Sequence, residues 1–229
     1  MARRIPADRF DRLVRGATEV LIERGYRRTQ MADVAEAIGV AKGTLYGYVD
    51  SKDALLALCL EFADASDPIP LPAELPVRSP LAGEIGQRVK EVISQDAQMP
   101  HLAAALANAR VPDAQAEAAG VVGELFDLMY ARRHGIKLLD RCMDHPELRD
   151  LWQTQGREDV RAGLARYLEH RIASGDFRTF EDTRLAARFV VESCATWAVH
   201  IHWDRAPERY AEAQARSNAI EFVVRGLLS

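Results

Sequence analysis

The chain has 229 residues, 48% of them hydrophobic, and a net charge of −4. This composition is typical of a folded globular protein and excludes an intrinsically disordered one. No run approaches the roughly 18 apolar residues of a membrane span, and no apolar stretch follows the basic N-terminus, so neither a membrane span nor a secretory signal is expected. The three cysteines, Cys59, Cys142 and Cys194, are far apart in apolar contexts. We expect them to be reduced thiols in a cytoplasmic protein.

The charge is unevenly distributed along the chain. Residues 1–55 hold ten Lys or Arg and eight Asp or Glu, a net charge of +2, whereas the remainder holds twenty and twenty-six, a net charge of −6. A weakly positive end on an acidic body fits a protein that approaches phosphate groups with one end only. The difference is small, so the function has to be inferred from motifs.

Apolar residues recur at helical spacing along nearly the whole chain, and no period-two run indicates a strand. Glycine and small polar residues punctuate the first part of the pattern at places typical of helix ends. The predicted elements of this part are a helix over 7–24 ended by Gly25, a short helix capped by Thr29, a left-handed turn at Gly39, a third helix over 41–49, and a fourth over 52–65 capped by Ser51.

Five prolines between residues 67 and 80 predict a loop or extended connector, which is the one plausible boundary in the chain. Gly175 is expected to end the longest of the helices that follow. The helices predicted after the connector cover residues 81–95, 98–109, 113–133, 135–142, 146–174, 181–203 and 207–227. The sequence therefore predicts an all-α fold.

Residues 29–52 have the pattern of two short helices packed closely on each other. Ala35 is small where the two helices must cross, and Gly39 reverses the chain within very few residues. A compact apolar core is supplied by Val34, Ile38, Val40, Leu45 and Val49. This arrangement leaves a polar and aromatic face on the second short helix, made of Lys42, Gly43, Thr44, Tyr46, Gly47 and Tyr48.

This segment resembles the DNA-binding domain of the TetR family of bacterial repressors. The resemblance lies in the run Gly-Val-Ala-Lys-Gly-Thr-Leu-Tyr at 39–46 and in Ser-Lys-Asp-Ala-Leu at 51–55. The preceding Glu-Arg-Gly-Tyr at 23–26, the chain length and the all-helical remainder are also similar to the family. The resemblance implies a three-helix helix-turn-helix DNA-binding domain over residues 1–54, with helix 52–65 as the connection. A helical-bundle domain for effector binding and dimerisation would follow over residues 66–229.

Three residues depart from the family pattern. Ala41 replaces the usual capping Ser, which we expect to cost the third helix about 1 kcal/mol. Gly47 replaces a large side chain that often faces DNA, and it destabilises the helix by roughly 1 kcal/mol relative to Ala. Val49 replaces the commoner Phe in the core. These departures bear on the strength of base recognition and not on the fold.

The resemblance also implies roles for single residues at the DNA interface. Thr29 would present its hydroxyl and nearby backbone N–H groups to a phosphate. Gly43 would let the duplex approach closely, and Thr44 and Tyr48 would contact base edges or thymine methyl groups. Further phosphate contacts are expected from Lys42, Tyr46 and Lys52. The alternative places both tyrosines in the core and both lysines on a solvated face.

Members of this family bind near-palindromic double-stranded DNA operators as dimers, and the broad apolar faces of the last two helices suit a homodimer interface. The resemblance further implies a small-molecule effector bound in the helical bundle. The candidate effector-binding residues are Phe62, Phe126, Tyr130, Trp152, Gln155 and Trp197. Their aromatic character favours a hydrophobic or aromatic effector, although an ordinary core role is the alternative for each of them.

We therefore expect a ligand-responsive transcriptional regulator, a repressor that its effector releases from DNA; an activator or a regulator without small-molecule control is the alternative. The residues do not favour an enzyme. His200 and His202 are two apart on a helix and point in different directions, His145 is explained by capping at a helix start, and Cys194 has no evident base. No catalytic site, metal site or cofactor is expected.

Overall fold

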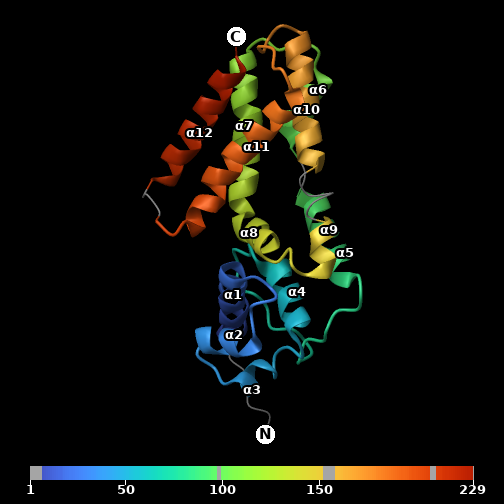
Figure 1. The fold of residues 1–229 in the computed structure, drawn as a ribbon, viewed down its shortest axis with the longest axis vertical. Coiled ribbons are helices and arrows are strands. Elements are labelled where there is room, and N and C mark those ends of the chain that lie inside the picture. Colours follow the sequence, from blue (N-terminus) through green and yellow to red (C-terminus); the bar gives the residue numbers. More distant parts are fainter. Residues whose placement is uncertain (1–6, 97–98, 152–157, 207–209, 229) are drawn as a thin grey trace. The chain divides into compact units, whose positions relative to one another are not determined.

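Helices make up most of the described part of the chain in the computed structural model (Figure 1). Outside the helices, the described part of the chain contains two isolated β-bridges, so the predicted all-α class is confirmed. No helix in this part is long and apolar enough to cross a membrane. The structure describes residues 7–96, 99–151, 158–206 and 210–228.

The chain folds into two compact units, and each of them combines segments that are far apart in the sequence. The first comprises residues 1–94 and 134–154, and the second comprises residues 95–133 and 155–229. These two units are defined by how the chain packs. The predicted domains, residues 1–54 for DNA binding and residues 66–229 for effector binding and dimerisation, are defined by function, and that division stays a prediction.

The first unit is built on α1, which packs against α2 and α4 through a core that includes Phe10, Leu13 and Leu55. Its glycine turns were anticipated by the sequence: Gly25, at the end of α1, has a φ of +78°. The elements of this unit are α1 (Ala7–Arg24), α2 (Met31–Ala37), α3 (Lys42–Leu45), α4 (Lys52–Phe62), α5 (Glu84–Asp96), α8 (Arg133–Arg141) and α9 (Pro146–Leu151).

Two helix starts and ends differ from the prediction. α2 begins one residue later than expected, because its N-cap residue is Gln30 rather than Thr29. The predicted helix over 41–49 is α-helical only from Lys42 to Leu45 and then becomes a turn. Gly47 lies in that turn, and the low helix propensity of glycine accounts for the early end.

Charged side chains attach α8 to the rest of the first unit at backbone atoms. The Arg141 guanidinium donates to the carbonyl oxygens of Ile22 and Glu23, both at 2.8 Å, near the C-terminal end of α1. The Asp64 carboxylate accepts from the backbone N–H of His134 at 2.9 Å, at the start of α8. Each charge has the sign that a helix end attracts, so these contacts satisfy terminal backbone groups that would otherwise lack partners.

The proline-rich segment, which we call the proline strap (residues 67–80), is also part of the first unit. The Arg15 guanidinium donates to the carbonyl oxygens of Ala65 and Asp67, both at 3.1 Å. The backbone N–H of Ile69 donates to the Asp11 carboxylate at 3.0 Å, and the Ile69 side chain is buried. The segment predicted as a connector is therefore fastened to α1 at its beginning.

The second unit is a helical bundle in which α7 packs against α6, α11 and α12, while α10 packs against α6 and α11. Asp113 and Asp182 cap α7 and α11 through their carboxylates. The elements are α6 (Pro100–Ala107), α7 (Ala114–Ala131), α10 (Glu158–Ala173), α11 (Thr183–Ala198), the 3₁₀ turn η2 (His200–Trp203) and α12 (Glu212–Leu227).

The last helices are shorter than predicted. The helix expected over 181–203 leaves the α conformation at Val199, whose ψ is −64° with a φ of −121°, and continues as η2. The last helix begins at Glu212 rather than near residue 207. The helix expected over 146–174 is represented by α9 and α10, with residues 152–157 outside the described part.

A buried ion pair in the second unit was not anticipated from the sequence. Arg171 of α10 is fully buried, and it donates to both oxygens of the Glu117 carboxylate on α7, at 2.7 and 2.8 Å. It also donates to the carbonyl oxygen of Ala105 at 2.9 Å. One guanidinium nitrogen of Arg171 and the hydroxyl of Tyr167 are buried without a hydrogen-bond partner. The pair thus ties α6, α7 and α10 together and depends on the Glu117 charge.

Glu117→Ala should lower the free energy of unfolding by about 3–5 kcal/mol, because it leaves the Arg171 charge buried and uncompensated. Urea denaturation measures this change. The matched control is Glu221→Ala, which breaks the exposed Glu221–Arg225 pair and should cost less than about 1 kcal/mol. If the two variants lose the same stability, the buried pair has no special structural role.

Candidate DNA-binding interface

The turn between α2 and α3 sets the direction of α3. Gly39 has a φ of +70°, a left-handed conformation that suits glycine, and its N–H donates to the carbonyl oxygen of Glu36 at 3.1 Å. The N–H of Val40 donates to the carbonyl oxygen of Ala35 at 2.9 Å. Leu45 is fully buried beneath the turn. This is the geometry of a helix-turn-helix, and it confirms the turn predicted at Gly39.

The start of α2 is fixed to the end of α1 by Asp33. Its carboxylate accepts from the backbone N–H of Gln30 at 2.8 Å and pairs with the Arg24 guanidinium at 2.7 Å. The backbone hydrogen bond from Gln30, together with Arg24, holds the pKa of Asp33 below its usual value. α1 and α2 form the platform that supports α3. They are therefore held together by polar contacts at their ends as well as by their buried apolar side chains.

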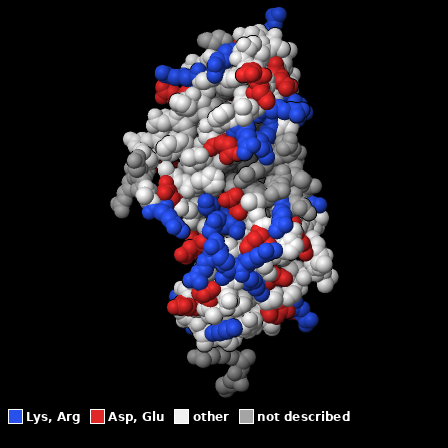
Figure 2. Space-filling model, in the orientation of Figure 1, with Lys and Arg blue, Asp and Glu red and all other residues white. Residues whose placement is uncertain are grey.

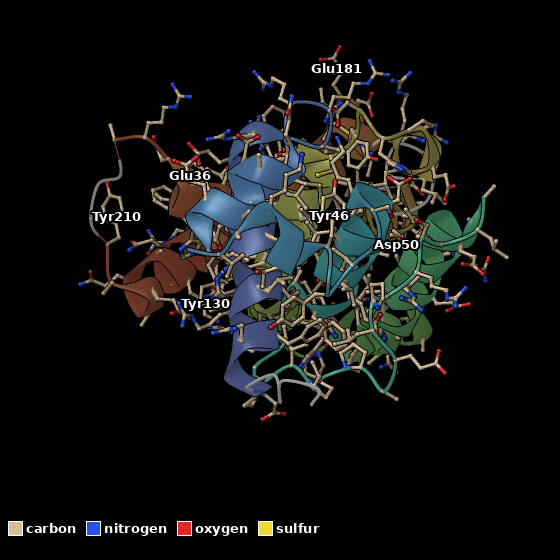
Figure 3. All side chains as sticks on the ribbon, turned by 90° about the horizontal axis from the view of Figure 1, so that it is seen from below. Glu36, Tyr46, Asp50, Tyr130, Glu181 and Tyr210 are labelled. Atoms are coloured by element: carbon tan, nitrogen blue, oxygen red, sulfur yellow. The ribbon has the colours of Figure 1, made fainter. Side chains whose placement is uncertain are left out.

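Four of the residues predicted to face DNA are exposed on α3 and directly after it. Lys42, Gly43 and Thr44 are exposed, and the Tyr46 side chain keeps 42% of its surface accessible. The Lys42 ammonium lies 6.0 Å from the centroid of the Tyr46 ring. Figure 3 views the molecule from the end that carries α3 and labels Tyr46 on this side. The combination gives one short face with a positive charge, a hydroxyl and an aromatic ring.

Tyr48 does not belong to this face, and the prediction that it contacts bases is wrong for this structure. Its side chain is only 2% exposed, and its ring lies 6.2 Å from that of Phe10 of α1. The prediction assumed that a helix continues to residue 49, whereas the turn after Leu45 rotates Tyr48 inward. Tyr48 therefore helps to anchor α3 on α1.

Thr29 is also buried, so the prediction that its hydroxyl binds a phosphate is wrong as well. The hydroxyl donates to the carbonyl oxygen of Gly25 at 2.7 Å.

Lys52 makes contacts within the protein. Its ammonium donates to the carbonyl oxygens of Tyr26 and Thr29, at 2.9 and 3.0 Å, and lies 4.1 Å from the Tyr26 ring centroid. An ammonium has three N–H donors, so a phosphate contact by the third stays a prediction.

A polar cluster that sequence reasoning missed surrounds Tyr26. Its hydroxyl donates to the Asp53 carboxylate, and burial, followed by this contact, raises the pKa of Tyr26 well above its usual value. The His145 ring packs edge-on against the Tyr26 ring, with centroids 4.7 Å apart. His145 accepts from the backbone N–H of Glu147 at 3.3 Å, which confirms its expected place at a helix start. The cluster connects α4 with the segment before α9.

Basic side chains gather over the part of the molecule that contains α1 and α2, with acidic ones among them (Figure 2). The surface of this region is therefore mixed in charge rather than uniformly basic, in keeping with the small positive charge counted in the sequence. The exposed arginines of this region include Arg12, Arg15, Arg24, Arg27 and Arg28.

The described effector candidates have structural partners within the protein. Phe126 lies in the core of the second unit. The Tyr130 hydroxyl donates to the Glu212 carboxylate, which raises the pKa of Tyr130. Trp197 packs edge-on against Tyr210, with ring centroids 5.4 Å apart. Phe126 thus agrees with the core alternative, whereas Tyr130 and Trp197 are half-buried. The role of all three residues in effector binding stays a prediction.

The remaining candidates are Phe62, Trp152 and Gln155. Phe62 is half-buried at the end of α4, in the first unit, whereas Phe126, Tyr130 and Trp197 belong to the second. Trp152 and Gln155 lie outside the described residues. A hollow of about 370 Å³ lies between α11 and α12, and its lining contains none of the six candidates.

No group of three or more His, Cys, Asp or Glu side chains could hold a metal ion within the ranges that the structure describes. Cys59, Cys142 and Cys194 are buried and free, as expected. Burial raises the pKa of all three thiols to about 12, so they are poor nucleophiles at neutral pH.

Residues 13–59, which contain this helix-turn-helix, match the family model described as bacterial regulatory proteins of the tetR family. Residues 13–59 are therefore a TetR-type helix-turn-helix segment. The domain indicates a DNA-binding transcriptional regulator rather than an enzyme. No curated protein gives a significant sequence match to the chain.

Solved structures of transcriptional regulators, some of them described as TetR-family members, share the fold over nearly the whole chain. KstR2 of Mycobacterium tuberculosis, a ketosteroid transcriptional regulator, aligns with a TM-score of 0.58 at 17% identity, over 99% of this chain and 97% of its own. SCO3833 of Streptomyces coelicolor aligns with a TM-score of 0.58 at 23% identity, over 95% and 91%. PfmR of Thermus thermophilus aligns with a TM-score of 0.54 at 22% identity, over 96% and 97%. The similarity therefore extends from the TetR domain through the helical bundle.

Tyr48→Ala should lower the free energy of unfolding by roughly 3–5 kcal/mol, because it removes a fully buried aromatic ring. The matched control, Tyr46→Ala, removes an exposed ring of the same type and should change stability by less than about 1 kcal/mol. Thermal or urea unfolding of both variants tests the assignment of the two tyrosines. A larger loss for Tyr46→Ala would contradict the inward position of Tyr48.

Proposed function

We propose that the protein is a ligand-responsive repressor that binds a near-palindromic double-stranded DNA operator as a homodimer. The observation that carries this proposal is the exposed face of α3, with Lys42, Gly43, Thr44 and Tyr46 held outward on the α1–α2 platform. A helix held in this way can enter the major groove of a duplex, because its side chains are not needed for packing.

Each exposed residue has a role that its chemistry supports. Lys42 supplies a charge for a phosphate, and the Tyr46 hydroxyl supplies a further hydrogen bond to the backbone of the duplex. Thr44 can contact a base edge through its hydroxyl or a thymine methyl group through its own methyl. Gly43 leaves open space, since nothing lies within 4 Å of the position that a Cβ would occupy. The duplex can therefore approach the backbone of α3 closely.

The outer faces of α11 and α12 support dimerisation. Leu185 and Phe189 of α11 and Phe222 of α12 expose 51%, 66% and 80% of their surfaces. They line the hollow between the two helices together with the buried side chains Val190 and Val223. Large apolar side chains clustered on a surface are typical of a protein interface. A second copy of the same pair of helices would cover them in a four-helix arrangement.

Dimerisation makes operator recognition possible for such a small DNA-binding element. Two copies of α3 related by a two-fold axis would enter successive major grooves about 34–36 Å apart. A compound that binds the helical bundle, proposed as residues 66–229, would release the DNA if it prefers a dimer in which this spacing is different. The aromatic candidates in the bundle favour a hydrophobic or aromatic effector. An activator, or a regulator without a small-molecule effector, is the alternative.

Lys42→Ala should weaken binding to all DNA sequences alike and reduce the slope of log K against log salt by about 1.8 for a bound dimer, because one phosphate contact is lost in each protomer. Thr44→Val should instead change the preference at one base pair by about 1–3 kcal/mol. Fluorescence anisotropy with a set of operator variants, at several salt concentrations, measures both effects. Lys90→Ala, on the exposed face of α5, is the control for loss of a lysine. An unchanged preference for Thr44→Val would contradict base recognition by the Thr44 hydroxyl.

Phe189→Glu and Phe222→Glu should each weaken self-association by about 2 kcal/mol or more, which is roughly a 30-fold higher Kd. The reason is that a carboxylate would have to be buried in an apolar interface. Analytical ultracentrifugation over a range of concentrations gives the Kd. Leu81→Glu, at another exposed apolar residue, is the control and should leave the Kd unchanged. Dimers of normal affinity in both phenylalanine variants would place the interface elsewhere.

A further inference from the structure

Backbone hydrogen bonds join residues 48–50, a few residues after α3, to the proline strap. The backbone N–H of Val77 donates to the carbonyl oxygen of Tyr48 at 2.8 Å, and the N–H of Asp50 donates to the carbonyl oxygen of Val77 at 3.0 Å. Val77 and Val49 form an isolated parallel bridge through these bonds. The strap therefore runs beside the segment that leads out of α3, although the paired valines lie 28 positions apart in the sequence.

A side chain also fixes the strap two residues later, at Ser79. The Ser79 hydroxyl donates to the Asp50 carboxylate at 2.8 Å and lies 2.6 Å from the hydroxyl of Ser51. Ser51 in turn caps α4 by accepting from the backbone N–H of Ala54 at 3.0 Å. Val77 and Ser79 are thus both held in place, one through its backbone and the other through its side chain.

Arg78 lies between these two fixed residues, and its side chain is exposed. Within the described part of the chain, no hydrogen bond or ion pair holds its guanidinium. Its charge acts on Asp50: the hydrogen bond from Ser79 and the charge of Arg78 both lower the pKa of Asp50. Figure 3 labels Asp50 on the side of the molecule that also carries Tyr46. The backbone on both sides of Arg78 is therefore held in place near the end of α3, while the charged side chain of Arg78 extends into solvent.

We infer that the proline strap is part of the DNA-binding surface and that Arg78 binds a phosphate of the duplex beside α3. The inference rests on the proposed function. A guanidinium suits this role, because it donates two parallel hydrogen bonds to a phosphate and is always charged. The prolines and the bonds at Val77 and Ser79 order the strap before DNA arrives, so little conformational entropy remains to be lost on binding.

A purely structural role for Arg78 predicts a different behaviour. If Arg78 served only to neutralise Asp50, its removal would matter only while the Asp50 carboxylate is present. If Arg78 binds a phosphate directly, its removal weakens DNA binding to the same extent when residue 50 carries no charge. The two roles can therefore be separated in an Asp50→Asn background.

The experiment uses the full chain and a DNA fragment from the region upstream of its own gene, titrated at several salt concentrations. Arg78→Ala should weaken binding roughly threefold to tenfold and reduce the slope of log K against log salt by about 1.8 for a bound dimer, which is about 0.9 for each protomer. Arg149→Ala, which removes an exposed arginine of α9 in the same unit, is the matched control and should change neither quantity. The same loss should follow when Arg78→Ala is made in the Asp50→Asn protein.

Each outcome is decisive. If Arg78→Ala behaves like Arg149→Ala while Lys42→Ala weakens binding, the inference about the strap is overturned and the proposed function stands. If the effect of Arg78→Ala disappears in the Asp50→Asn protein, direct phosphate binding is overturned. If the unaltered protein has no salt-dependent affinity for DNA, the proposed function itself fails. Thermal unfolding of each variant verifies that the exposed substitution leaves the fold intact.

Discussion

The position of α3 depends on the burial of the residues around it rather than on the helix itself. Four residues make about one turn, and an isolated helix of this length is not stable in water. Leu45 at its end and Tyr48 and Val49 directly after it are buried, while Gly39 provides the reversal before it. Because these anchors fix the helix on both sides, the remaining side chains have one defined outward direction. Every proposal about DNA depends on that constraint.

Hydrogen bonds to backbone atoms attach further segments, α8 and the proline strap, to the helices that support α3. Arg141 binds the last carbonyl groups of α1, Asp64 binds the first N–H groups of α8, and the strap pairs with the chain after α3 through Val77. Such contacts satisfy groups that have no partner within a helix, and they are directional, so they fix orientation as well as proximity. The first unit is consequently larger than the segment that matches the TetR family model.

Hydrophobic spacing and glycine positions were sufficient to predict most helices and the turn at Gly39, because both signals are local. The position of Tyr48 could not be predicted, since it depends on where α3 ends, and a shift of a few residues turns a side chain from one face to another. The burial of Arg171 has a local signal, because Arg171 lies four residues after Tyr167 on an apolar stripe of its helix. The pairing of the strap with residue 49 has no local signal, because it joins distant segments.

The inward position of Tyr48 changes how operator specificity should arise in the proposed regulator. With glycine at residue 47 and Tyr48 in the core, Thr44 is the principal side chain left on α3 for base contacts, and one such contact discriminates by only about 1–3 kcal/mol. Phosphate contacts add affinity without sequence information. The two-fold symmetry of a dimer doubles the base contacts, and it makes the spacing and shape of the half-sites part of what is recognised. For a protein with this α3, dimer geometry therefore matters more to specificity than it would for one with a larger set of base-contacting side chains.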